Sequence, residues 1–265
     1  MTPPSTPTYN AAFFNAHEKD AITSAQTILP FALDWTKAQS VIDVGCGHGA
    51  WLSVCRAHGI SDILGVDGDY VRSAQLLIPS ESFQARNLER PFTLDRRFDL
   101  AMSLEVAEHL DPASAQAFIK TLTQLAPVVL FSAAIPHQGG AHHVNEQWQD
   151  YWAKRFEAEG FIPVDALRRR VWALAEVNWW YKQNMMLYVQ RDRLADYPEL
   201  ATEAEIGSVI PLALVHPDKL REVCEPRRMT VTRWIEMQKT LLLGVPTVFG
   251  KAFSRRLKRL RRPKS

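Results

Sequence analysis

The stretch VIDVGCGHGAWL, Val41 to Leu52, decides the fold of this chain. An apolar, β-branched run stops at three closely spaced glycines, Gly45, Gly47 and Gly49, and then resumes with helical spacing as far as Gly59. The first run predicts a buried strand, and the residues after the glycines predict a helix. Because glycines replace side chains where the strand ends, we expect a turn whose backbone a ligand approaches closely.

Segments typical of strands and helices alternate along the rest of the chain. Beside the strand at 40–45, the expected strands are DILGVD (62–67), SFQARNL (82–88), RFDLAMSLEV (97–106), PVVLFSAAI (127–135), FIPVDAL (161–167) and QNMMLYVQRD (183–192). Helices are expected between most of them, and the helix AITSAQTILPFALDW precedes the first strand. The alternation predicts a doubly wound, mostly parallel sheet of seven strands with helices on both faces.

Two of the expected helices have boundary signals. Asp111 and Pro112 are suited to cap and open the helix ASAQAFIKTLTQLA, because a short acceptor side chain followed by proline is preferred there. In NEQWQDYWAKRFEAEGF (145–161), Asn145 is the expected cap and Gly160 the expected stop. These two helices follow the fourth and fifth expected strands.

Composition limits the class of protein. With 265 residues, of which 46% are hydrophobic and 23% charged, the chain has the mixture of one globular domain with room for an appendage. No apolar run is long enough to span a bilayer, and the stretch MTPPSTPTYN lacks the features of a signal peptide. Cys46, Cys55 and Cys224 match no metal-ligand spacing and suit a reducing compartment. We therefore expect a cytoplasmic protein.

Positive charge is concentrated at the C-terminal end. The formal net charge is +2, but the residues after Glu236 carry nine Lys and Arg and no acid, so the rest has a charge of about −7. Phe249, Phe253, Leu257 and Leu260 recur there at helical spacing, which predicts a basic amphipathic helix. Such a helix is suited to peripheral contact with an anionic membrane, and docking on a protein surface or on RNA are the alternatives. The acidic body makes nucleic acid the least favoured partner.

Two acidic residues narrow the ligand of the glycine turn. Asp67 ends the next strand, where a carboxylate accepts hydrogen bonds from both hydroxyls of a ribose. Asp43 precedes the glycines in a pattern that differs from the GxGxxG of dinucleotide-binding folds; its charge repels a pyrophosphate but can hold a cationic amino-acid group. The loop DVGCGHG (43–49) resembles motif I of the class I S-adenosylmethionine-dependent methyltransferases, and the resemblance extends through most of residues 36–190.

The resemblance implies a Rossmann-like fold and S-adenosylmethionine as the cofactor. It implies that the backbone of Gly45 to Gly49 cradles the methionine part and that Asp67 holds the ribose. Asn87 stands where the family often has an aspartate against the adenine, and its amide can still bond the adenine amino group. The residues expected to contact the cofactor are Asp43, Gly45, Cys46, Gly47, Gly49, Asp67, Gly68, Asn87, Leu88, Leu104 and Glu105.

Histidines follow the fourth and fifth expected strands. SLEVAEHLDP (103–112) resembles the segment that follows the fourth strand in the family, and an imidazole such as His109 is suited to take a proton from an attacking hydroxyl. Alternatively, Glu105 and Glu108 order this loop and His109 packs under the cofactor. The second stretch, IPHQGGAHHVNEQW (135–148), is a poor core segment and a good substrate loop.

The candidates for base or substrate contact in the second loop are His143, Asn145 and Glu146. Asn145 and Glu146 are equally suited to begin the next helix and complement its dipole. We predict His109, His143 and Glu146 as the catalytic residues. The histidines and acids of the two loops can converge on a metal ion, but no spacing is diagnostic in the way that HExxH is. We therefore predict no metal ligands, with a divalent ion as the less favoured alternative.

The second loop also resembles a bacterial group of methyltransferase-domain proteins with a GGxxHxNEQ segment and a later WWYxQN, matched here at 139–147 and 179–184. Members of that group look linked to surface-glycan assembly. The resemblance therefore implies O-methylation of a sugar hydroxyl in a glycan or glycolipid precursor. Trp179, Trp180 and Tyr181 can stack on a sugar face or pack against the sheet. The alternatives are N- or carboxyl-methylation of a small metabolite and a non-catalytic cofactor-binding scaffold.

The same resemblance divides the chain into three parts. An N-terminal helical cap (1–35) is expected to pack at the sheet edge or to cover the site. A methyltransferase domain (36–195) follows it. A C-terminal helical extension with the basic tail (196–265) completes the chain.

Overall fold

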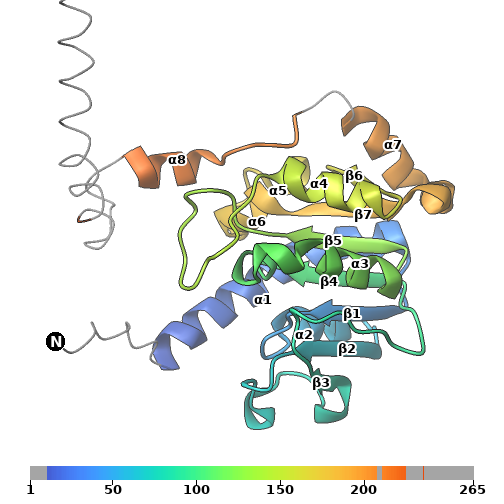
Figure 1. Ribbon diagram of the computed structural model, residues 1–265, viewed down its shortest axis with the longest axis vertical. Helices are drawn as coiled ribbons and strands as arrows, with labels where there is room; N and C mark the ends of the chain where they lie inside the picture. The colour runs from blue at the N-terminus through green and yellow to red at the C-terminus, as the bar shows by residue number, and fades with distance from the viewer. Residues whose placement is uncertain (1–10, 208–210, 225–234, 236–265) are drawn as a thin grey trace, which may run out of the picture. The chain divides into compact units, whose positions relative to one another are not determined.

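The computed structural model describes residues 11–207, 211–224 and 235. Its main feature is a seven-stranded sheet (Figure 1). The strands are β1 (Ser40–Val44), β2 (Asp62–Asp67), β3 (Phe83–Ala85), β4 (Leu100–Leu104), β5 (Val128–Ser132), β6 (Phe161–Val164) and β7 (Met186–Gln190). They lie in the order β3-β2-β1-β4-β5-β7-β6, in which β7 is antiparallel to both neighbours and the other pairs are parallel. The prediction of a Rossmann-like, mostly parallel seven-stranded sheet is confirmed.

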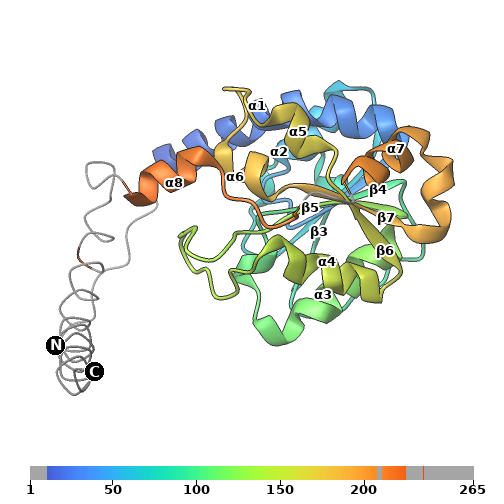
Figure 2. The same cartoon turned by 90° about the horizontal axis from the view of Figure 1, so that it is seen from above.

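Helices cover both faces of this sheet (Figure 2). They are α1 (Ala11–Thr36), α2 (Ala50–Ala57), α3 (Ala115–Leu125), α4 (Gln149–Ala158), α5 (Leu167–Val171), α6 (Trp179–Asn184) and α7 (Pro198–Gly207). One face packs against α1, α2, α5, α6 and α7, and the opposite face packs against α3 and α4. This arrangement follows from the connections, since parallel neighbouring strands need a crossover that passes over one face or the other.

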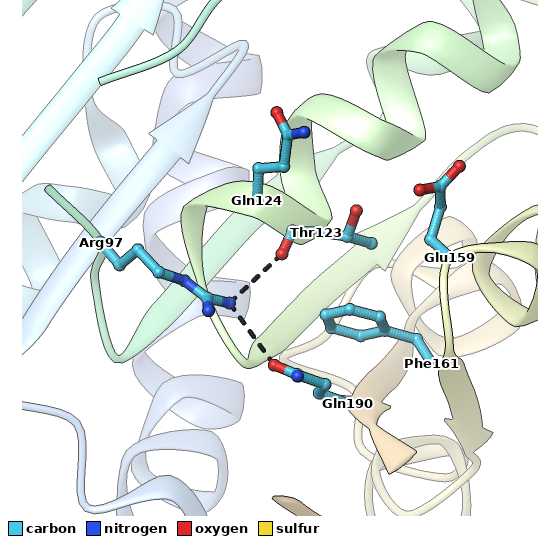
Figure 3. Close-up of a pocket in the computed structure, with 6 residues that line it drawn as sticks. All are labelled: Arg97, Thr123, Gln124, Glu159, Phe161 and Gln190. Atoms are coloured by element: carbon cyan, nitrogen blue, oxygen red, sulfur yellow. Dashed lines mark hydrogen bonds between the residues drawn. The ribbon is translucent and has the colours of Figure 1, made fainter. Parts of the chain in front are cut away.

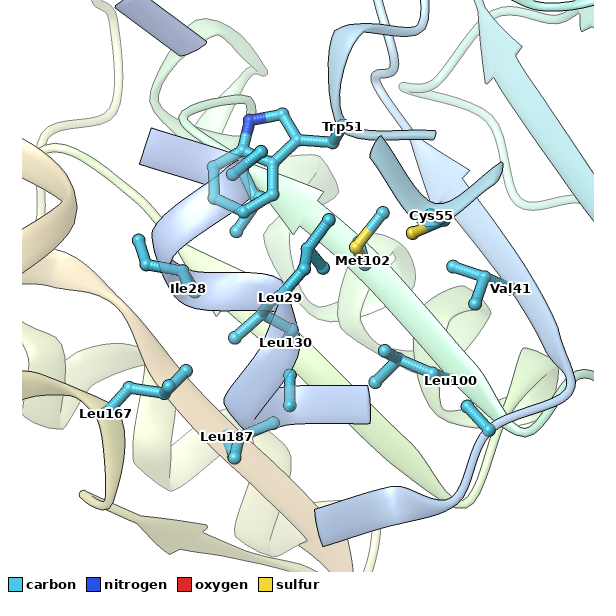
Figure 4. Packing of buried hydrophobic residues seen from close by; sticks show 14 of the residues in the cluster. Ile28, Leu29, Val41, Trp51, Cys55, Leu100, Met102, Leu130, Leu167 and Leu187 are labelled. Atoms are coloured by element: carbon cyan, nitrogen blue, oxygen red, sulfur yellow. The ribbon is translucent and has the colours of Figure 1, made fainter. Parts of the chain in front are cut away.

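Each face of the sheet has its own apolar core. On the first face, Ile28 and Leu29 of α1 pack over Leu100, Leu130 and Leu187 from three neighbouring strands (Figure 4). The cluster on the second face is rich in aromatic side chains, namely Phe118, Phe131, Trp152, Phe156, Phe161 and Tyr188. Because strand residues such as these are buried on both faces, the central strands read as continuous apolar runs rather than as alternating patterns.

The third expected strand is shorter than predicted. The structure confines β3 to residues 83–85, whereas the prediction extended to residue 88. Arg86 still donates its N–H to the carbonyl of Asp67 at 2.7 Å. Beyond it, the side chain of Asn87 accepts the N–H of Glu89 at 2.9 Å. This local turn takes the backbone away from β2 and ends the strand.

The predicted start of the helix after β5 is wrong. Helix α4 begins at Gln149, and its cap position is Trp148, which makes no side-chain capping bond. Asn145 is 2% exposed, and its Nδ2 atom donates to the carbonyl of Ala107 at 3.3 Å. Its N–H donates to the carbonyl of Glu108 at 3.0 Å. Asn145 therefore ties two loops together and caps no helix.

The predicted start of the last strand is also wrong. Gln183 and Asn184 lie in α6, and β7 begins only at Met186. The N–H of Met185 donates to the carbonyl of Tyr181 at 3.0 Å, which is a helical contact. The polar pair at the end of this short helix therefore lies beside the sheet edge rather than within a strand.

The chain divides into two compact units, residues 1–216 and 217–265. Helix α7 contacts β6 and therefore belongs to the first unit, although residue 196 was the predicted start of the C-terminal extension. The second unit contains α8 (Pro217–Cys224). The predicted amphipathic helix at 249–260 lies outside the described residues. Within the described part of the chain, no helix has both the length and the apolar character needed to cross a bilayer.

Candidate active site

Several polar loops lie together at one end of the sheet, the edge formed by the carboxyl ends of its parallel strands. Strands β1, β2, β4 and β5 are parallel neighbours, so their carboxyl ends lie at the same edge. The glycine turn follows β1, Asp67 ends β2, Glu105 follows β4, and the loop at 133–148 follows β5. In open α/β sheets this edge, at the reversal of strand order between β1 and β4, is where ligands bind.

The glycine turn is shaped largely by the protein around it. Gly45, Gly47 and Gly49 have φ angles of 91°, 54° and 85°, which residues with side chains rarely adopt. A Cβ atom on Gly45 would lie 2.3 Å from Cγ2 of Val106, and one on Gly49 would lie 3.0 Å from Ile78. A Cβ atom on Gly47 would meet nothing within 4 Å. Packing therefore accounts for two of the glycines, and Gly47 is the one next to open space.

Several amides of this turn already donate hydrogen bonds within the protein. The N–H groups of Gly45 and Cys46 donate to the carbonyl of Val66 at 2.7 and 3.3 Å. The N–H of Gly47 donates to Oδ2 of Asp67 at 2.6 Å. Phosphate-binding glycine turns present free amides to an anion. The amides of Gly45, Cys46 and Gly47 are therefore already used within the protein, unlike those of a phosphate-binding turn.

Asp67 is 4% exposed at the end of β2. Besides the bond from the turn, its Oδ1 atom accepts the N–H of Gly68 at 2.6 Å and the hydroxyl of Tyr70. Tyr70 is 74% exposed, so its side chain reaches back from the surface to this carboxylate. The Tyr70 hydroxyl occupies an acceptor position that the sequence predicts for a ribose hydroxyl.

Asp43 is buried in the strand that leads into the turn, with 3% of its surface exposed. Burial, followed by the charge of Asp67, raises the pKa of its carboxyl to about 8. Burial and the same two carboxylates also raise the pKa of the Cys46 thiol, which excludes a thiolate nucleophile there near neutral pH. A cation bound against the turn would lower the pKa of Asp43 again.

The remaining predicted cofactor residues lie after β3 and at the end of β4. Asn87 is exposed, and the turn that it forms with Glu89 fixes its side-chain oxygen. Leu88 is half-buried against the core of the second face, and Leu104 is 9% exposed. The structure thus places a polar and an apolar side chain in succession beyond β3, the pattern that the sequence predicts for an adenine contact.

Glu105 is the centre of a buried amide network. Its φ angle is 54°, a left-handed conformation that costs a non-glycine residue on the order of 1–3 kcal/mol. Its N–H donates to Ser132, and its carboxylate accepts Nδ2 of Asn184 at 3.0 Å and Nε2 of Gln138 at 2.8 Å. Gln183 donates to Asn184 in turn. Burial raises the pKa of Glu105, while these hydrogen bonds oppose the rise.

Glu146 organises the loop at 133–148. Its Oε2 atom accepts the N–H of His137 at 2.7 Å, and its Oε1 atom accepts the N–H of Gly139 at 2.8 Å. The same Oε1 atom lies 2.9 Å from Nδ1 of His143. The His143 ring packs edge-on against the ring of His109, with 4.8 Å between centroids. The structure therefore brings together the three residues predicted as catalytic.

Glu108 and His109 lie side by side in different environments. The Glu108 side chain is 0% exposed, and neither carboxylate oxygen makes a close, well-aligned hydrogen bond with the described residues, although the backbone N–H groups of Glu108 and Ala134 and the Glu105 carboxyl lie near it. Burial, followed by the charge of Glu105, raises the pKa of Glu108 well above its usual value. His109 is exposed overall, but partial burial and the nearby His143 lower the pKa of its imidazole. The His109 ring is therefore neutral at pH 7.

The aromatic residues of WWYKQN contribute mainly to packing. Tyr181 is 7% exposed, and its ring meets Trp51 edge-on at 5.2 Å. Trp180 packs against the core of the first face. The loop that contains His143 exposes two large apolar side chains, Val144 at 60% and Trp148 at 40%.

A comparison with protein families supports the interpretation of this edge. The model of a family described as a methyltransferase domain matches residues 16–179, which is more than half of the chain. The chain belongs to this family. It is a class I S-adenosylmethionine-dependent methyltransferase, and S-adenosylmethionine is its cofactor, as the motif at 43–49 predicts.

Two solved structures have the same fold as this methyltransferase. The sugar N-methyltransferase KedS8 from a Streptoalloteichus species aligns with a TM-score of 0.52 at 17% identity, over 72% of this chain and 99% of its own. DesVI from Streptomyces venezuelae aligns with a TM-score of 0.51 at 14% identity, over 67% of this chain and 95% of its own. At these identities the likeness establishes the fold alone. A comparison with curated proteins finds no match.

The N-terminal helix of the methyltransferase reaches the cofactor edge. Oε2 of Glu18 in α1 lies 2.9 Å from Nδ1 of His48 in the glycine turn. The same helix contributes Ile28 and Leu29 to the core on the first face of the sheet. Helix α1, which precedes the first strand in the sequence, therefore contributes both to the core and to the lining of the candidate site.

A hollow of about 280 Å³ lies elsewhere on the methyltransferase. Its lining residues are Arg97, Thr123, Gln124, Glu159, Phe161 and Gln190 (Figure 3). Arg97 precedes β4, Thr123 and Gln124 lie in the last turn of α3, Glu159 follows α4, Phe161 begins β6, and Gln190 ends the antiparallel β7. The hollow is therefore at the sheet edge opposite the glycine turn, away from the cofactor residues.

Sequence reasoning missed several residues of the site. Gln138 and Asn184 hold Glu105, and Tyr70 bonds Asp67. The motifs GGxxHxNEQ and WWYxQN contain or adjoin the two amides, but only the fold shows that they converge on one carboxylate. Glu108 stood in a motif that the sequence singled out, yet its burial could not be read from the motif.

Proposed function

We propose that the protein transfers the methyl group of S-adenosylmethionine to a hydroxyl group of a sugar in a glycan or glycolipid precursor. The observation that carries this proposal is the pair of histidines at the active-site edge, with His143 held by Glu146 and packed against His109. A hydroxyl is a weak nucleophile and needs a base near neutral pH, whereas a carboxylate acceptor needs none.

The donor is held by the turn after β1 and by Asp67. The carbonyl oxygens of the turn and the carboxylate of Asp43 attract the ammonium group of the methionine part. Asp67 accepts the ribose hydroxyls in place of the Tyr70 hydroxyl, and Asn87 with Leu88 meets the adenine. This assignment rests on the hydrogen bonds that already orient Asp67 and on the raised pKa of Asp43.

The transfer is an in-line displacement at the methyl carbon. The acceptor oxygen forms the new bond to carbon while the carbon–sulfur bond breaks, and S-adenosylhomocysteine leaves as a neutral thioether. His143 takes the hydroxyl proton. A carboxylate at Nδ1 favours the tautomer with its proton there, which leaves a lone pair on the other ring nitrogen. His109, whose pKa is lowered, is the alternative base.

The acceptor lies against the loop at 133–148. Trp148 is 40% exposed and Val144 is 60% exposed, so this loop presents apolar and aromatic surface to a ligand. Aromatic rings suit the apolar face of a pyranose. Half-buried Trp179 is a second candidate for this contact.

A matched pair of acceptors tests the proposal. The purified protein is incubated with labelled S-adenosylmethionine and with sugars that carry either a hydroxyl or an amine at the same position. We expect an alkali-stable methyl ether on the hydroxyl sugar. Transfer to the amine alone would contradict the proposal. Calorimetry with S-adenosylmethionine, run first, separates a failed donor site from a wrong acceptor.

The alternatives are N- or carboxyl-methylation of a small metabolite and a non-catalytic scaffold that binds the cofactor. The name of KedS8 describes a sugar N-methyltransferase, so an amino sugar is the first such acceptor to test. A carboxylate acceptor needs no base, so replacing both histidines would then cost little. A scaffold would bind S-adenosylmethionine without turnover of any acceptor.

We further propose a cytoplasmic protein that contacts anionic membranes through its basic C-terminal residues, as a lipid-linked acceptor requires. Each Lys or Arg near such a surface contributes on the order of 1 kcal/mol. A chain that ends near Leu243 should lose binding to vesicles containing phosphatidylserine. The same vesicles without the anionic lipid are the control, and retained binding of the shortened chain would remove the membrane contact.

A further inference from the structure

The geometry points to a divalent metal site formed by Glu108, His109 and His143, which no sequence motif indicates. Each of the three side chains offers one ligand atom, and these atoms all lie within 4.8 Å of one another. They come from the loop after β4 and the loop after β5, so the site bridges two parallel neighbours at the active-site edge. The inference rests on the proposed function only for the role of the ion, and not for its binding.

Glu108 supplies the strongest argument. Its side chain is 0% exposed, and neither carboxylate oxygen makes a close, well-aligned hydrogen bond with the described residues, although the backbone N–H groups of Glu108 and Ala134 and the Glu105 carboxyl lie near it. A buried polar group without partners costs several kcal/mol, and folded proteins pair such groups or place them on metals. The neighbouring Glu105, by contrast, accepts hydrogen bonds from two amide side chains. The fold thus satisfies one carboxylate and leaves the next one facing two imidazoles.

The surroundings of His143 match those of metal-bound histidines. Oε1 of Glu146 lies 2.9 Å from Nδ1 of this ring. Histidines that bind metals usually donate their other ring nitrogen to a carboxylate, which fixes the tautomer and orients the ring. Glu146 is itself held by two backbone N–H groups, at 2.7 and 2.8 Å. It therefore acts as a positioning residue for this site.

The ligand set selects the class of ion. Two imidazoles and one carboxylate suit Mn²⁺, Fe²⁺, Co²⁺ or Zn²⁺ better than Ca²⁺ or Mg²⁺, which prefer oxygen ligands alone. With bonds of about 2.1 Å at tetrahedral angles, ligand atoms lie about 3.4 Å apart. The cluster therefore needs to contract by up to about 1.4 Å to hold an ion in this geometry.

Three protein ligands leave coordination positions for an acceptor. Within the proposed function, an ion here would bind the acceptor hydroxyl and lower its pKa, so that the hydroxyl proton passes to solvent. The metal would then replace His143 and His109 as the means of activating the hydroxyl, because both imidazoles are ligands. The acceptor class then narrows to sugars that can present a hydroxyl, or two adjacent hydroxyls, to a metal. An amine that is already nucleophilic gains little from such an ion.

Titration with Co²⁺ alone tests the site in the full-length protein after treatment with a chelator. We expect one Co²⁺ per chain, with visible absorption bands of nitrogen and oxygen ligation. His109→Gln and His143→Gln should each weaken binding at least tenfold, and Glu146→Gln should weaken it about tenfold or more. His142→Gln is the matched control, because this exposed neighbour lies outside the cluster, and it should bind as the wild type does. Equal binding by all these variants, or no saturable binding, would overturn the site.

Glu108→Gln distinguishes a ligand from a structural residue. The substitution keeps the shape and removes a buried charge, so the metal-free variant should melt no lower than the wild type. Co²⁺ should raise the melting temperature of the wild type and not that of this variant. An unchanged Co²⁺ shift in Glu108→Gln would remove Glu108 from the site.

Neither measurement includes a donor or an acceptor, so the two proposals fail separately. If Co²⁺ does not bind while sugar hydroxyls are methylated, the metal site is wrong and the proposed function holds. If Co²⁺ binds and no hydroxyl is methylated, the site holds and the proposed function is wrong.

Discussion

The donor half and the acceptor half of the active site differ in how their polar groups are satisfied. The donor half consists of the turn at 45–49 with Asp67, and the acceptor half consists of Glu105, Glu108 and the loop at 133–148. In the donor half, turn amides and the Asp67 carboxylate already bond one another. In the acceptor half, Glu105 has a strained backbone, and the buried Glu108 carboxylate makes no well-aligned hydrogen bond with the described residues.

The difference shows which half is complete without its ligand. A preorganised donor half loses little free energy of binding to rearrangement, because the changes it needs are the departure of the Tyr70 hydroxyl from Asp67 and the loss of a proton from Asp43. The acceptor half retains a desolvated carboxylate beside two imidazoles, an arrangement that gains free energy when a positive charge or a proton enters it. We therefore expect specificity for the acceptor to depend on the second half.

Asp67→Ala should have the largest effect on the donor half. It removes the expected acceptor for two ribose hydroxyls and the tether of the Gly47 amide, so affinity for S-adenosylmethionine should fall at least about 100-fold. Calorimetry measures the loss, and circular dichroism checks the fold. Asp67→Asn, which keeps one acceptor oxygen, should lose less. Unchanged binding by the alanine variant would remove the ribose assignment.

His143→Gln should have the largest effect on the acceptor half. Loss of the base should lower kcat for a hydroxyl acceptor about 100-fold, because proton transfer by a positioned side chain contributes this much. Affinity for S-adenosylmethionine should stay unchanged, since the two halves are separate. His142→Gln serves as the neighbouring control. A variant that loses donor affinity and turnover together would show that the halves are coupled.

Asp43→Asn should reveal how much folding stability is lost by burying the Asp43 carboxyl beside the donor half. The pKa of Asp43 is about 8 in the folded state against 3.8 for an aspartate in water, so between these values the folded state binds a proton that the unfolded state releases. The stabilisation that the Asp43 carboxyl contributes to the folded state is fully present below its unfolded-state pKa. It is lost as the pH rises from there to about 8, by up to about 1.4 kcal/mol per pH unit.

The variant should therefore be more stable than the wild type at pH 8, with the difference shrinking toward pH 5. Urea unfolding without cofactor at three pH values measures this change. Equal slopes of stability against pH in the two proteins would show that Asp43 is ionised in the folded state. With cofactor present, the ammonium group should release the proton of Asp43, which calorimetry in two buffers of different ionisation enthalpy detects.

Tyr70→Phe should have the smallest effect. Its hydroxyl competes with a ribose hydroxyl for Asp67, and a hydrogen bond of this kind is worth about 0.5–1.5 kcal/mol. Removing the competitor should tighten S-adenosylmethionine binding a few-fold in calorimetry. Weaker binding would instead show that Tyr70 contacts the bound cofactor.

The donor half could be predicted from the sequence because its determinants are local. A strand, three glycines and a helix follow one another within Val41 to Ala57, and Asp67 ends the very next strand. The reason for the three glycines was only partly predictable, because Val106 packs against Gly45 and Ile78 packs against Gly49. Gly47 is the one of the three that borders open space, where we expect the ligand. The side chains that pack against Gly45 and Gly49 come from distant parts of the chain.

The acceptor half required the tertiary structure. Glu105, Gln138 and Asn184 are separated by 33 to 79 positions in the chain, and no periodicity shows that they meet. Asn145 has the residue type of a helix cap, yet its bonds to Ala107 and Glu108 override that local preference.

By itself, the sequence determined the order of strands and helices, the glycine turn and its acidic partner, because each depends on neighbours in the chain. Only the tertiary structure decided which charges are buried, since burial depends on contacts between distant segments. Glu108 shows the difference: its place beside His109 is written in the sequence, and its desolvation beside His143 is created by the parallel pairing of β4 and β5.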